Sequence, residues 1–350
     1  GMVKVNEKLA LPHSVHLHAN NLGRPGNYTT TLDTLKVPKG IKSQRQRQTL
    51  HITHIQFNSY GGDSWNSLES KSDKIANAIN KLDNITVDTG NIIFGDTTTM
   101  SADGPLEYYL QSITGLKWAN RNVELETSPG VTPMIYSPKM ATTSIQWAIG
   151  LELPLLIKDP WKVFLATDHP NGGPFTKYPE IIASLMSSKL RNQTLSGVNK
   201  AVNKRSILPT LEREYDFYDV AIFTRAGQAK ALGLDKNKGH LGVGAHADIA
   251  VYDLNPDKID PNNEHKLIKD KFSMAYLTIK DGKIVVRDRK ITKVIDGRTY
   301  WIDSVTPKNI EKEVYKDIDY YFKRYYSINL ANYPVSEDYI TRPTVLKTNA

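Results

Sequence analysis

The sequence predicts an α/β fold, either a βα barrel or a doubly wound parallel sheet, followed by a smaller β-rich part. Two observations support this prediction. Four short apolar runs each lead into a turn rich in Gly or Asn, and helical periodicity lies between several of them. Polar residues stand where these runs end, which is where both architectures place their functional sites. A chain of 350 residues is long enough for one large domain and a small one.

The four apolar runs are predicted to be buried strands. They cover residues 14–18, 49–55, 91–94 and 163–168. Between the second and third runs, residues 72–82 place Ile75, Ala78, Ile79 and Leu82 at helical spacing, which predicts a helix. Strands that alternate with loops and helices in this way are typical of a parallel sheet joined by crossovers.

The chain changes character after residue 238. Residues 239–252 are β-rich and contain several glycines, and the alternating runs 275–280 and 283–287 are joined by Asp281-Gly282, a strong hairpin signal. A tail rich in Tyr and Lys follows, with a helix expected over 308–325. The predicted regions are an α/β domain over 1–238, a small β domain over 239–300, and a helical and irregular tail over 301–350.

Composition limits the kinds of site that this chain can form. It contains no cysteine, which excludes disulfides, thiolate zinc sites and iron–sulfur clusters bound by this chain. Any transition-metal site must therefore use imidazole and carboxylate. The net charge is +8, but the densest basic run, 39–47, is short and lacks interleaved aromatic residues. A solvated loop or helix is a better interpretation than a nucleic-acid site. An anionic substrate or an acidic partner subunit fits the same charge.

Other functional classes lack their sequence signals. No apolar stretch approaches the roughly 18 residues that a transmembrane helix needs. The start of the sequence has no apolar segment typical of a secretory signal. We therefore expect a cytoplasmic protein that binds neither membrane nor nucleic acid. Serine-hydrolase elbows, P-loops and dinucleotide fingerprints do not occur in the sequence.

Histidine is concentrated near the start of the sequence. Five of the nine histidines stand at positions 13, 16, 18, 51 and 54, and a sixth follows Asp168. A single strand histidine is more often a core residue than a ligand. Several at the ends of neighbouring strands favour a metal site, because catalytic zinc needs about three imidazole or carboxylate ligands. In regular strands His16 and His18 share a face, whereas His51 and His54 face opposite sides, so we expect one of the latter to join His18.

Asp168 ends an apolar strand, where its charge requires a partner. It could cap the following turn, residues 169–172. The nearby histidines favour a second interpretation, a metal-linked general base that takes a proton from bound water. The hydroxyl-rich stretch 96–104 either lines a pocket or caps a helix through Ser101 or Asp103, and both alternatives stay open.

These strand-end residues resemble the A-subunit family of formylmethanofuran dehydrogenase, within the amidohydrolase superfamily. The runs Asp96–Pro105 and Thr167–Phe175 are the most specific parts of the resemblance. It implies strands 5 to 8 of an amidohydrolase-type TIM barrel, followed by a small β-sandwich domain. The stretches that look like strand 5, strand 6, the strand-7 region, strand 8 and the exit to the β-sandwich are 11–23, 50–62, 92–105, 166–175 and 224–252.

The resemblance also implies two metal ions, usually zinc, at the mouth of the barrel. Carried over by position, His18 is the metal ligand of strand 5 and His54 that of strand 6. Asp168 is the metal-binding carboxylate of strand 8 and the catalytic residue that moves a proton. His16 and His51 are the reserve candidates for strands 5 and 6. The substrate-binding candidates are Asn20, Asn21, Gln56 and Asn171.

The family's reaction is amide hydrolysis in reverse. Formate and the amine of methanofuran condense to formylmethanofuran and water, in methanogenic reduction of carbon dioxide. A separate molybdenum- or tungsten-pterin subunit reduces carbon dioxide to the formate, so no pterin, nucleotide or iron–sulfur cluster is expected in this chain. The partners implied are the other subunits of the complex, with methanofuran and formate as substrates. A homo-oligomer is a second assembly to consider.

The sequence departs from the family at its amino side. The family's His-x-His pair of strand 1 and carboxylated Lys of strand 4 have no counterpart here, because His16-Leu17-His18 is followed by residues that match strand 5. We therefore expect a truncated barrel, which pairs with another polypeptide or lacks a complete two-metal site. The alternative functions are a cyclic-amide hydrolase of the hydantoinase or dihydroorotase type and a non-catalytic scaffold subunit.

Overall fold

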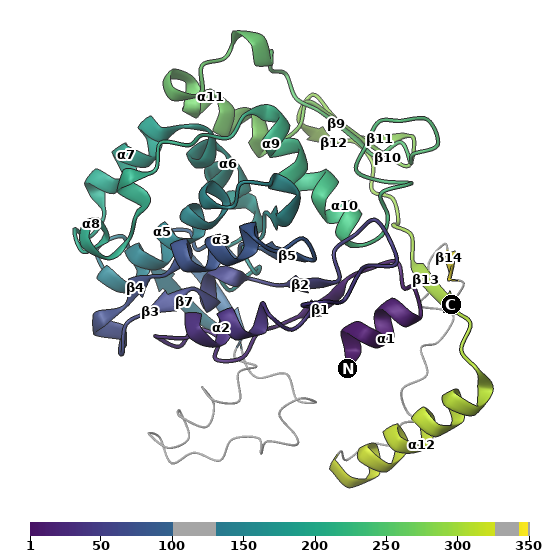
Figure 1. Ribbon diagram of the computed structural model, residues 1–350. Helices are drawn as coiled ribbons and strands as arrows, with labels where there is room; N and C mark the ends of the chain where they lie inside the picture. Colours follow the sequence, from purple (N-terminus) through teal and green to yellow (C-terminus); the bar gives the residue numbers. More distant parts are fainter. Residues whose placement is uncertain (101–130, 326–342, 349–350) are drawn as a thin grey trace. The chain divides into compact units, whose positions relative to one another are not determined.

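A four-stranded parallel sheet forms the centre of the fold. The computed structural model describes residues 1–100, 131–325 and 343–348. The sheet has the order β1-β2-β5-β8, and each pair of neighbouring strands is parallel. Figure 1 shows helices surrounding these strands. The predicted α/β class with a parallel sheet is confirmed. The strands are β1 (Val15–Leu17), β2 (Leu50–Ile52), β5 (Ile85–Asp88) and β8 (Val163–Phe164).

The two faces of this sheet have different chemistry. Side chains alternate between the faces of a strand, so residues one apart point to opposite sides. On the first face the register places His16 beside His51, and His51 beside Thr86. The opposite face belongs to the hydrophobic core, through five aliphatic residues that are at most 1% exposed: Leu50, Ile52, Ile85, Val87 and Val163.

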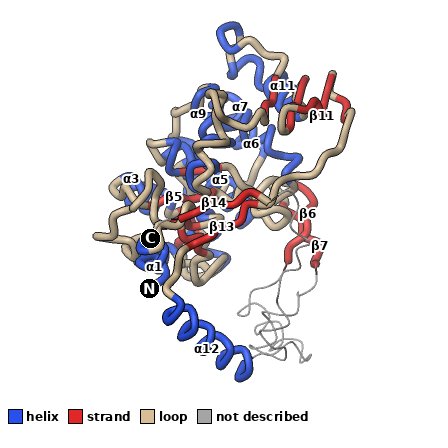
Figure 2. Tube along the Cα trace, turned by 90° about the vertical axis from the view of Figure 1, so that its right-hand side faces the viewer, coloured by secondary structure: helices blue, strands red, loops and turns tan. Residues whose placement is uncertain are grey.

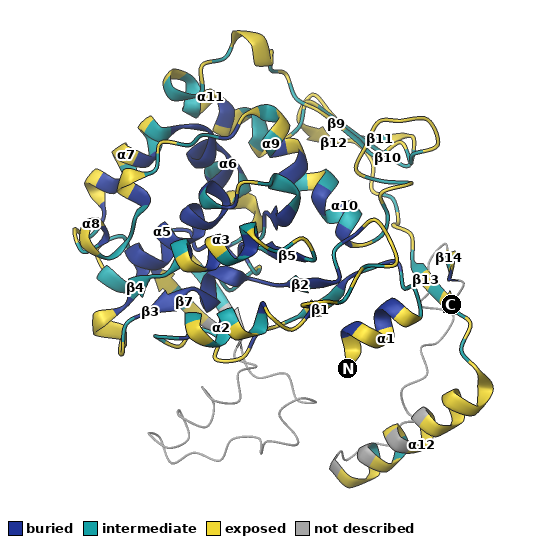
Figure 3. Ribbon diagram, in the orientation of Figure 1, coloured by how far each residue is buried: buried dark blue, intermediate teal, exposed yellow. Residues whose placement is uncertain are grey.

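The helix α5 (Ala141–Leu156) lies inside this core. All of its residues from Thr143 to Leu155 are buried, and they include apolar side chains on every side of the helix. A helix that is apolar all round is stable only when it is covered on all sides. Accordingly α5 packs against α3 (Ser72–Asn80), and Figure 3 shows α5 and α6 largely in the colour of buried residues.

The remaining helices range from the four-residue α8 to the 18-residue α12. No helix in the described part of the chain is long and apolar enough to cross a membrane. The α-helices not yet given are α1 (Met2–Lys8), α2 (Tyr28–Thr34), α6 (Tyr178–Met186), α7 (Ser188–Gly197), α8 (Val202–Arg205), α9 (Phe217–Ala221), α10 (Gly227–Ala231), α11 (Pro261–Ser273) and α12 (Lys308–Tyr325). The helical turns are η1 (Ile55–Asn58), η2 (Trp65–Ser67), η3 (Pro160–Lys162), η4 (Phe175–Lys177), η5 (Leu208–Thr210), the π-helical η6 (Ile222–Ala226) and η7 (Pro256–Lys258).

The β-rich region after residue 238 contains an antiparallel sheet of order β12-β11-β10-β9. Asp281 and Gly282 both have positive φ, at 51° and 75°, as a two-residue hairpin of the type I′ form requires. The predicted hairpin is confirmed. The strands of this sheet are β9 (Ile249–Val251), β10 (Leu277–Lys280), β11 (Lys283–Arg287) and β12 (Lys290–Ile291).

The chain forms two compact units. Unit 1 comprises 1–8, 12–97 and 135–295, and unit 2 comprises 9–11, 98–134 and 296–350. In unit 2, β13 (Tyr300–Ser304) pairs in parallel with β14 (Thr344–Thr348), and the helix predicted over 308–325 is present as α12 (Figure 2). The domain boundaries predicted at 238 and 300 stay a prediction. The other strand pairs are β3 (Tyr60–Gly61) with β4 (Glu69–Ser70) and β6 (Gly95–Met100) with β7 (Val131–Tyr136).

One predicted strand was wrong. Residues 91–94 form no strand, and β5 (Ile85–Asp88) takes the place in the sheet that they were expected to fill. The backbone of Asn91 instead donates to Ala166 O at 2.7 Å, and that of Ile93 to Gly172 O at 3.0 Å. Gly90, at φ 64°, turns the chain out of the strand before these residues. The stretch 91–94 is therefore a loop beside the end of β8.

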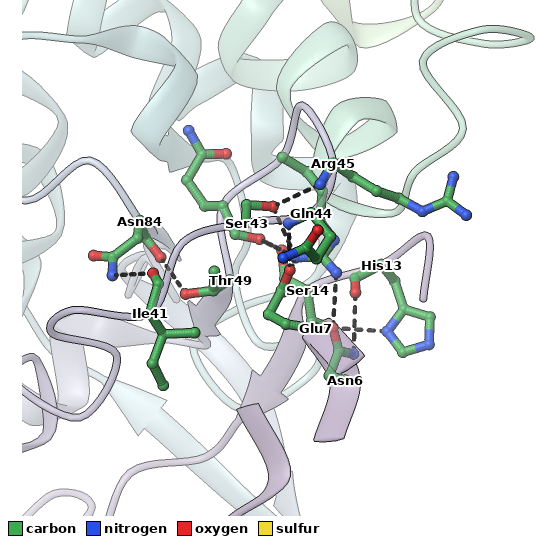
Figure 4. A network of polar contacts seen from close by, with 12 residues as sticks. Asn6, Glu7, His13, Ser14, Ile41, Ser43, Gln44, Arg45, Thr49 and Asn84 are labelled. Atoms are coloured by element: carbon green, nitrogen blue, oxygen red, sulfur yellow. Dashed lines mark hydrogen bonds and ion pairs between the residues drawn. The ribbon is translucent and has the colours of Figure 1, made fainter. Parts of the chain in front are cut away.

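A buried polar network attaches α1 to the rest of unit 1 (Figure 4). Arg47 Nη1 lies 2.5 Å from Glu7 Oε1, and the two side chains are 2% and 5% exposed. Arg47 also donates to Asn6 Oδ1 at 2.7 Å, and Glu7 Oε2 accepts from Gln44 N at 2.7 Å. Each buried charge thus has both an ionic partner and hydrogen bonds, which a buried ion pair needs to be stable.

Candidate functional site

Three imidazoles gather at the carboxyl ends of β1 and β2. His16 and His18 have their Nε2 atoms 3.2 Å apart, and His18 Nδ1 lies 2.9 Å from His54 Nε2. His16 and His18 are exposed, whereas His54 is 2% exposed. The structure therefore brings His18 together with His54, and places His16 next to them on the same face as His18.

His54 has an unusual backbone conformation. Its φ and ψ are 37° and 50°, in the left-handed region, which costs a non-glycine residue roughly 1–2 kcal/mol. Gly90 lies directly beside it, since a Cβ at Gly90 would be 2.6 Å from His54 Cβ. The regular strand ends at Ile52, so the alternation that separates His51 from His54 in a strand does not apply. The left-handed turn instead directs the His54 ring toward His18.

His51 makes contacts of a different kind. Its Nδ1 lies 2.9 Å from Thr86 Oγ1 and its Nε2 lies 3.1 Å from Asp88 Oδ2. The ring stacks on Phe164, with centroids 5.6 Å apart and planes 13° apart. Both ring nitrogens are engaged by protein groups, so His51 supports the face that carries His16 and Thr86. This arrangement is less suited to a metal ligand than that of His54.

Asp168 also has a left-handed backbone, at φ 47°. Its Oδ2 accepts a hydrogen bond from Asn171 Nδ2 at 3.0 Å, and its carbonyl accepts from Asn171 N at 2.6 Å. The Tyr136 hydroxyl donates to Asn171 O at 2.9 Å. The turn that the sequence predicts after Asp168 is thus present, and it fixes the carboxylate while leaving it near the histidines.

Burial keeps the imidazoles of His18 and His54 neutral, because it lowers the pKa of both. Burial, the largest influence, lowers the pKa of His54, and the opposing charges of Asp168 and Asp88 do not reverse it. Burial also lowers the pKa of His18, together with the neighbouring His16. The neutral imidazole is the form that binds metal ions.

Asp88 is charged despite its burial. Burial by itself raises its pKa, but hydrogen bonds from His51, Thr53 and the backbone of His54 together lower the pKa below its usual value. The carboxylate is therefore ionised and accepts hydrogen bonds without donating any.

The substrate-binding candidates divide into two kinds. Gln56 is fully buried, and its Oε1 accepts from Ile92 N at 3.0 Å, so it supports the loop after β5. The side-chain amide of Asn171 donates a hydrogen bond to the Asp168 carboxylate. Asn20 is exposed at the end of β1, and Asn21, at φ 60°, donates to Thr30 Oγ1 at 3.1 Å. Their roles toward a substrate stay predictions. The part of the run 96–104 beyond residue 100 lies outside the described residues.

The side chains of His16, His18, His54 and Asp168 are of the types that bind zinc, but their positions match a zinc site only in part. Imidazole and carboxylate are the ligands zinc prefers once cysteine is absent. His18 faces His16 with one ring nitrogen and His54 with the other, so the three rings form a chain and do not converge on one point. Within the described ranges, no group of three or more His, Asp or Glu side chains is arranged to hold a metal ion. The His54 Nδ1 atom is buried and has no hydrogen-bond partner there.

A cavity of about 290 Å³ adjoins the histidines. Its polar lining includes His16, His51, Asp88 and Gln228, and Phe164 forms part of its apolar wall. This volume is at the lower end of the range for small-molecule sites. Sequence reasoning missed Asp88, Thr86 and Tyr136 at this site. For Asp88 the sequence did contain a signal. Residues 85–88 are a largely apolar run that ends in Asp, the same pattern that identified Asp168.

Comparison with known proteins places the chain in a family. The model of the amidohydrolase family matches residues 1–286. Protein FwdA of Methanocaldococcus jannaschii is 48% identical, over 100% of this chain and 62% of its own length. The A component of the formyltransferase/hydrolase complex Fhc of Methylorubrum extorquens is 36% identical, over 87% of this chain and 54% of its own length.

A solved structure agrees with these relatives. It is the crystal structure of the formyltransferase/hydrolase complex FhcABCD of Methylorubrum extorquens with methylofuran, with a TM-score of 0.82 and 33% identity, covering 100% of this chain and 61% of the matched chain. The chain thus spans about three-fifths of the length of the relatives it matches. The resemblance and the barrel-type fold predicted from the strand-end motifs are confirmed. The chain belongs to the amidohydrolase family.

Proposed function

We propose that this chain is part of the amidohydrolase-type subunit of a formylmethanofuran dehydrogenase, and that it serves the condensation of formate with methanofuran. The observation that carries the proposal is the contact of His18 with His54 beyond the ends of β1 and β2, with the Asp168 carboxylate close enough to interact electrostatically with both. The similarity to FwdA and to the A component of the Fhc complex supports the choice of reaction. In that reaction the amine nitrogen forms a bond to the formate carbon, and one carboxylate oxygen leaves as water.

Each site residue has a role in this proposal. His18 and His54 would hold a metal ion as neutral imidazoles, and Asp168 would contribute an oxygen ligand. A zinc ion held there would supply Lewis-acid chemistry at the formyl oxygen. Asp168 also carries the proton between the reacting amine nitrogen and the departing water, and the turn held by Asn171 keeps its carboxylate in place for this transfer. His16 is a further ligand candidate because its Nε2 faces that of His18.

The assembly and location are part of the same proposal. The matched structure is a complex named FhcABCD, so we propose that this chain works beside other subunits. Its net charge of +8 would favour acidic partner surfaces. Methanofuran and formate are the proposed substrates and the cytoplasm the proposed location.

A non-catalytic scaffold is the second candidate. It is favoured by the chain-like arrangement of His16, His18 and His54, which leaves no complete set of three metal ligands among the described residues. A cyclic-amide hydrolase of the hydantoinase or dihydroorotase type has less support, because the Methylorubrum relative and the matched structure are both named for a formyltransferase/hydrolase complex.

Zinc titration of the purified chain, followed by a formyl-amide hydrolysis assay, tests the proposal. We expect the wild type to bind zinc. His54→Gln and Asp168→Asn should each lower the zinc affinity at least tenfold and abolish any hydrolysis. His240→Gln, in an exposed loop, is the matched control and should behave as wild type. Stable folding with no zinc uptake by the wild type would instead establish the scaffold.

A further inference from the structure

We propose that Asp88 is a positioning residue that sets the geometry of this site through both of its carboxylate oxygens. Asp88 Oδ1 accepts from the His54 backbone N–H at 2.7 Å, and Oδ2 lies 3.1 Å from His51 Nε2. The carboxylate thereby joins the last residue of β5 to two residues that flank the end of β2. The proposal depends on the proposed function only in treating His54 as a metal ligand.

The first bond selects the conformation of His54. A left-handed non-glycine residue persists only where its surroundings specify it. Two features do so here: the Asp88 oxygen on the His54 N–H, and the space that Gly90 leaves against the His54 Cβ. The His54 ring contacts His18 through Nε2 and lies edge-on to Phe57, with ring centroids 5.9 Å apart. The backbone bond to Asp88 sets the direction in which the side chain leaves the main chain toward these two contacts.

The second bond fixes the hydrogen on His51. An ionised carboxylate only accepts hydrogen bonds, so His51 Nε2 carries the proton that it shares with Asp88. His51 Nδ1 lies 2.9 Å from Thr86 Oγ1, a hydroxyl that can donate or accept a hydrogen bond. Both ring nitrogens of His51 thus contact protein groups. We therefore assign a supporting role to His51, and His54, just after β2, remains the candidate metal ligand. The side chains of His51 and Asp88 are 12% and 14% exposed, so water competes little for these bonds.

Two substitutions separate the two bonds. Asp88→Asn keeps an oxygen for the His54 N–H and places an NH₂ group against His51 Nε2. Asp88→Ala removes both acceptors. Asp83→Asn is the matched control, because Asp83 is a fully exposed aspartate five residues earlier. The measurements on the full chain are the tautomer of His51 by ¹⁵N NMR, hydrogen exchange of the His54 amide, and the affinity for zinc.

In Asp88→Asn we expect the proton of His51 to move from Nε2 to Nδ1, while the His54 amide stays protected within about twofold. In Asp88→Ala we expect that amide to exchange at least tenfold faster. Zinc affinity should fall about 10–100-fold in both, as for other groups that orient metal ligands. If Asp88→Ala matches Asp83→Asn in amide exchange and in His51 tautomer, the proposal is overturned. A different outcome is that the wild type binds no zinc while the Asp88 variants still show the changes in NMR and amide exchange. That result would support the positioning role of Asp88 and refute only the proposed function.

Discussion

Two site residues, His54 and Asp168, share a left-handed backbone conformation that is uncommon outside glycine. Their φ values are 37° and 47°, and each is held by a hydrogen-bonded polar partner. Asp88 binds the His54 N–H, and Asn171 binds both the carbonyl and the carboxylate of Asp168. Strained residues of this kind often cluster at functional sites, where the surrounding contacts must specify them.

The support of Asp168 can be tested at Asn171. Asn171→Ala should lower kcat/KM for formyl-amide hydrolysis about 10–100-fold, because the carboxylate loses the amide that orients it. Tyr136→Phe removes only the hydroxyl that donates to Asn171 O, and should cost about 1 kcal/mol of stability and less activity. Steady-state kinetics and urea unfolding of both variants measure the two effects. Wild-type kcat/KM in Asn171→Ala would contradict the role given to it.

At the scale of elements, one carboxylate fastens the turn of the hairpin β10–β11, in addition to the pairing of β10 with β9. Asp248 Oδ1 accepts from Asp281 N at 2.7 Å, and Oδ2 pairs with Lys238, and with Lys280 at 3.5 Å. Burial raises the pKa of Asp248, but the bonds from Lys238 and Asp281 outweigh it and lower the pKa below the usual 3.8. Asp248 therefore links the segment after α10 to the turn of the hairpin.

This lowered pKa gives a pH dependence with a definite sign. The folded chain holds Asp248 ionised at a pH where the unfolded chain takes up a proton, so its stabilisation is present above pH 3.8. That stabilisation is lost as the pH falls through the lower folded pKa. Hydrogen exchange of the hairpin amides between pH 3 and 5 should show this loss in the wild type. Asp248→Asn should reduce the dependence, whereas the exposed Asp257→Asn should leave it unchanged.

Glu152 connects elements across unit 1 from inside the core. It is fully buried in α5, and its Oε1 accepts from the backbone N–H groups of Ile207 and Leu208 at 2.7 and 2.9 Å. Its Oε2 accepts from the hydroxyls of Ser70 and Ser72. One carboxylate thus ties α5 to β4, α3 and η5, which are far apart in sequence.

Removal of this carboxylate should weaken unit 1 as a whole. Glu152→Ala leaves four donors, two of them buried and two half-buried, without this acceptor, and we expect a loss of about 3–5 kcal/mol in the free energy of unfolding. Glu152→Gln keeps one oxygen and should lose less. Urea unfolding monitored by tryptophan fluorescence measures both. Equal stability of Glu152→Ala and the wild type would show that the network contributes little.

The fold class and the turns could be predicted from the pattern of residues, and the same pattern supplied the candidate donors. His18, His54 and Asp168 stand at the ends of apolar runs, and Asp281-Gly282 specifies a hairpin through local conformation alone. These features depend on neighbouring residues in the chain, so the pattern of residues was enough to predict them. The motif resemblance was confirmed for the same reason, because it rests on contiguous runs.

Only the tertiary structure decided which residues support those donors. The strand beside β2 is 85–88 and not 91–94, because Gly90 turns the chain away after Asp88. The pairings of Asp88 with His51 and His54 join residues 37 and 34 positions apart, which no local pattern specifies. Likewise His54 reaches His18 through a left-handed turn after β2, which strand periodicity does not specify. Parallel strands meet through crossovers, so their side-chain partners are fixed by packing and not by sequence spacing.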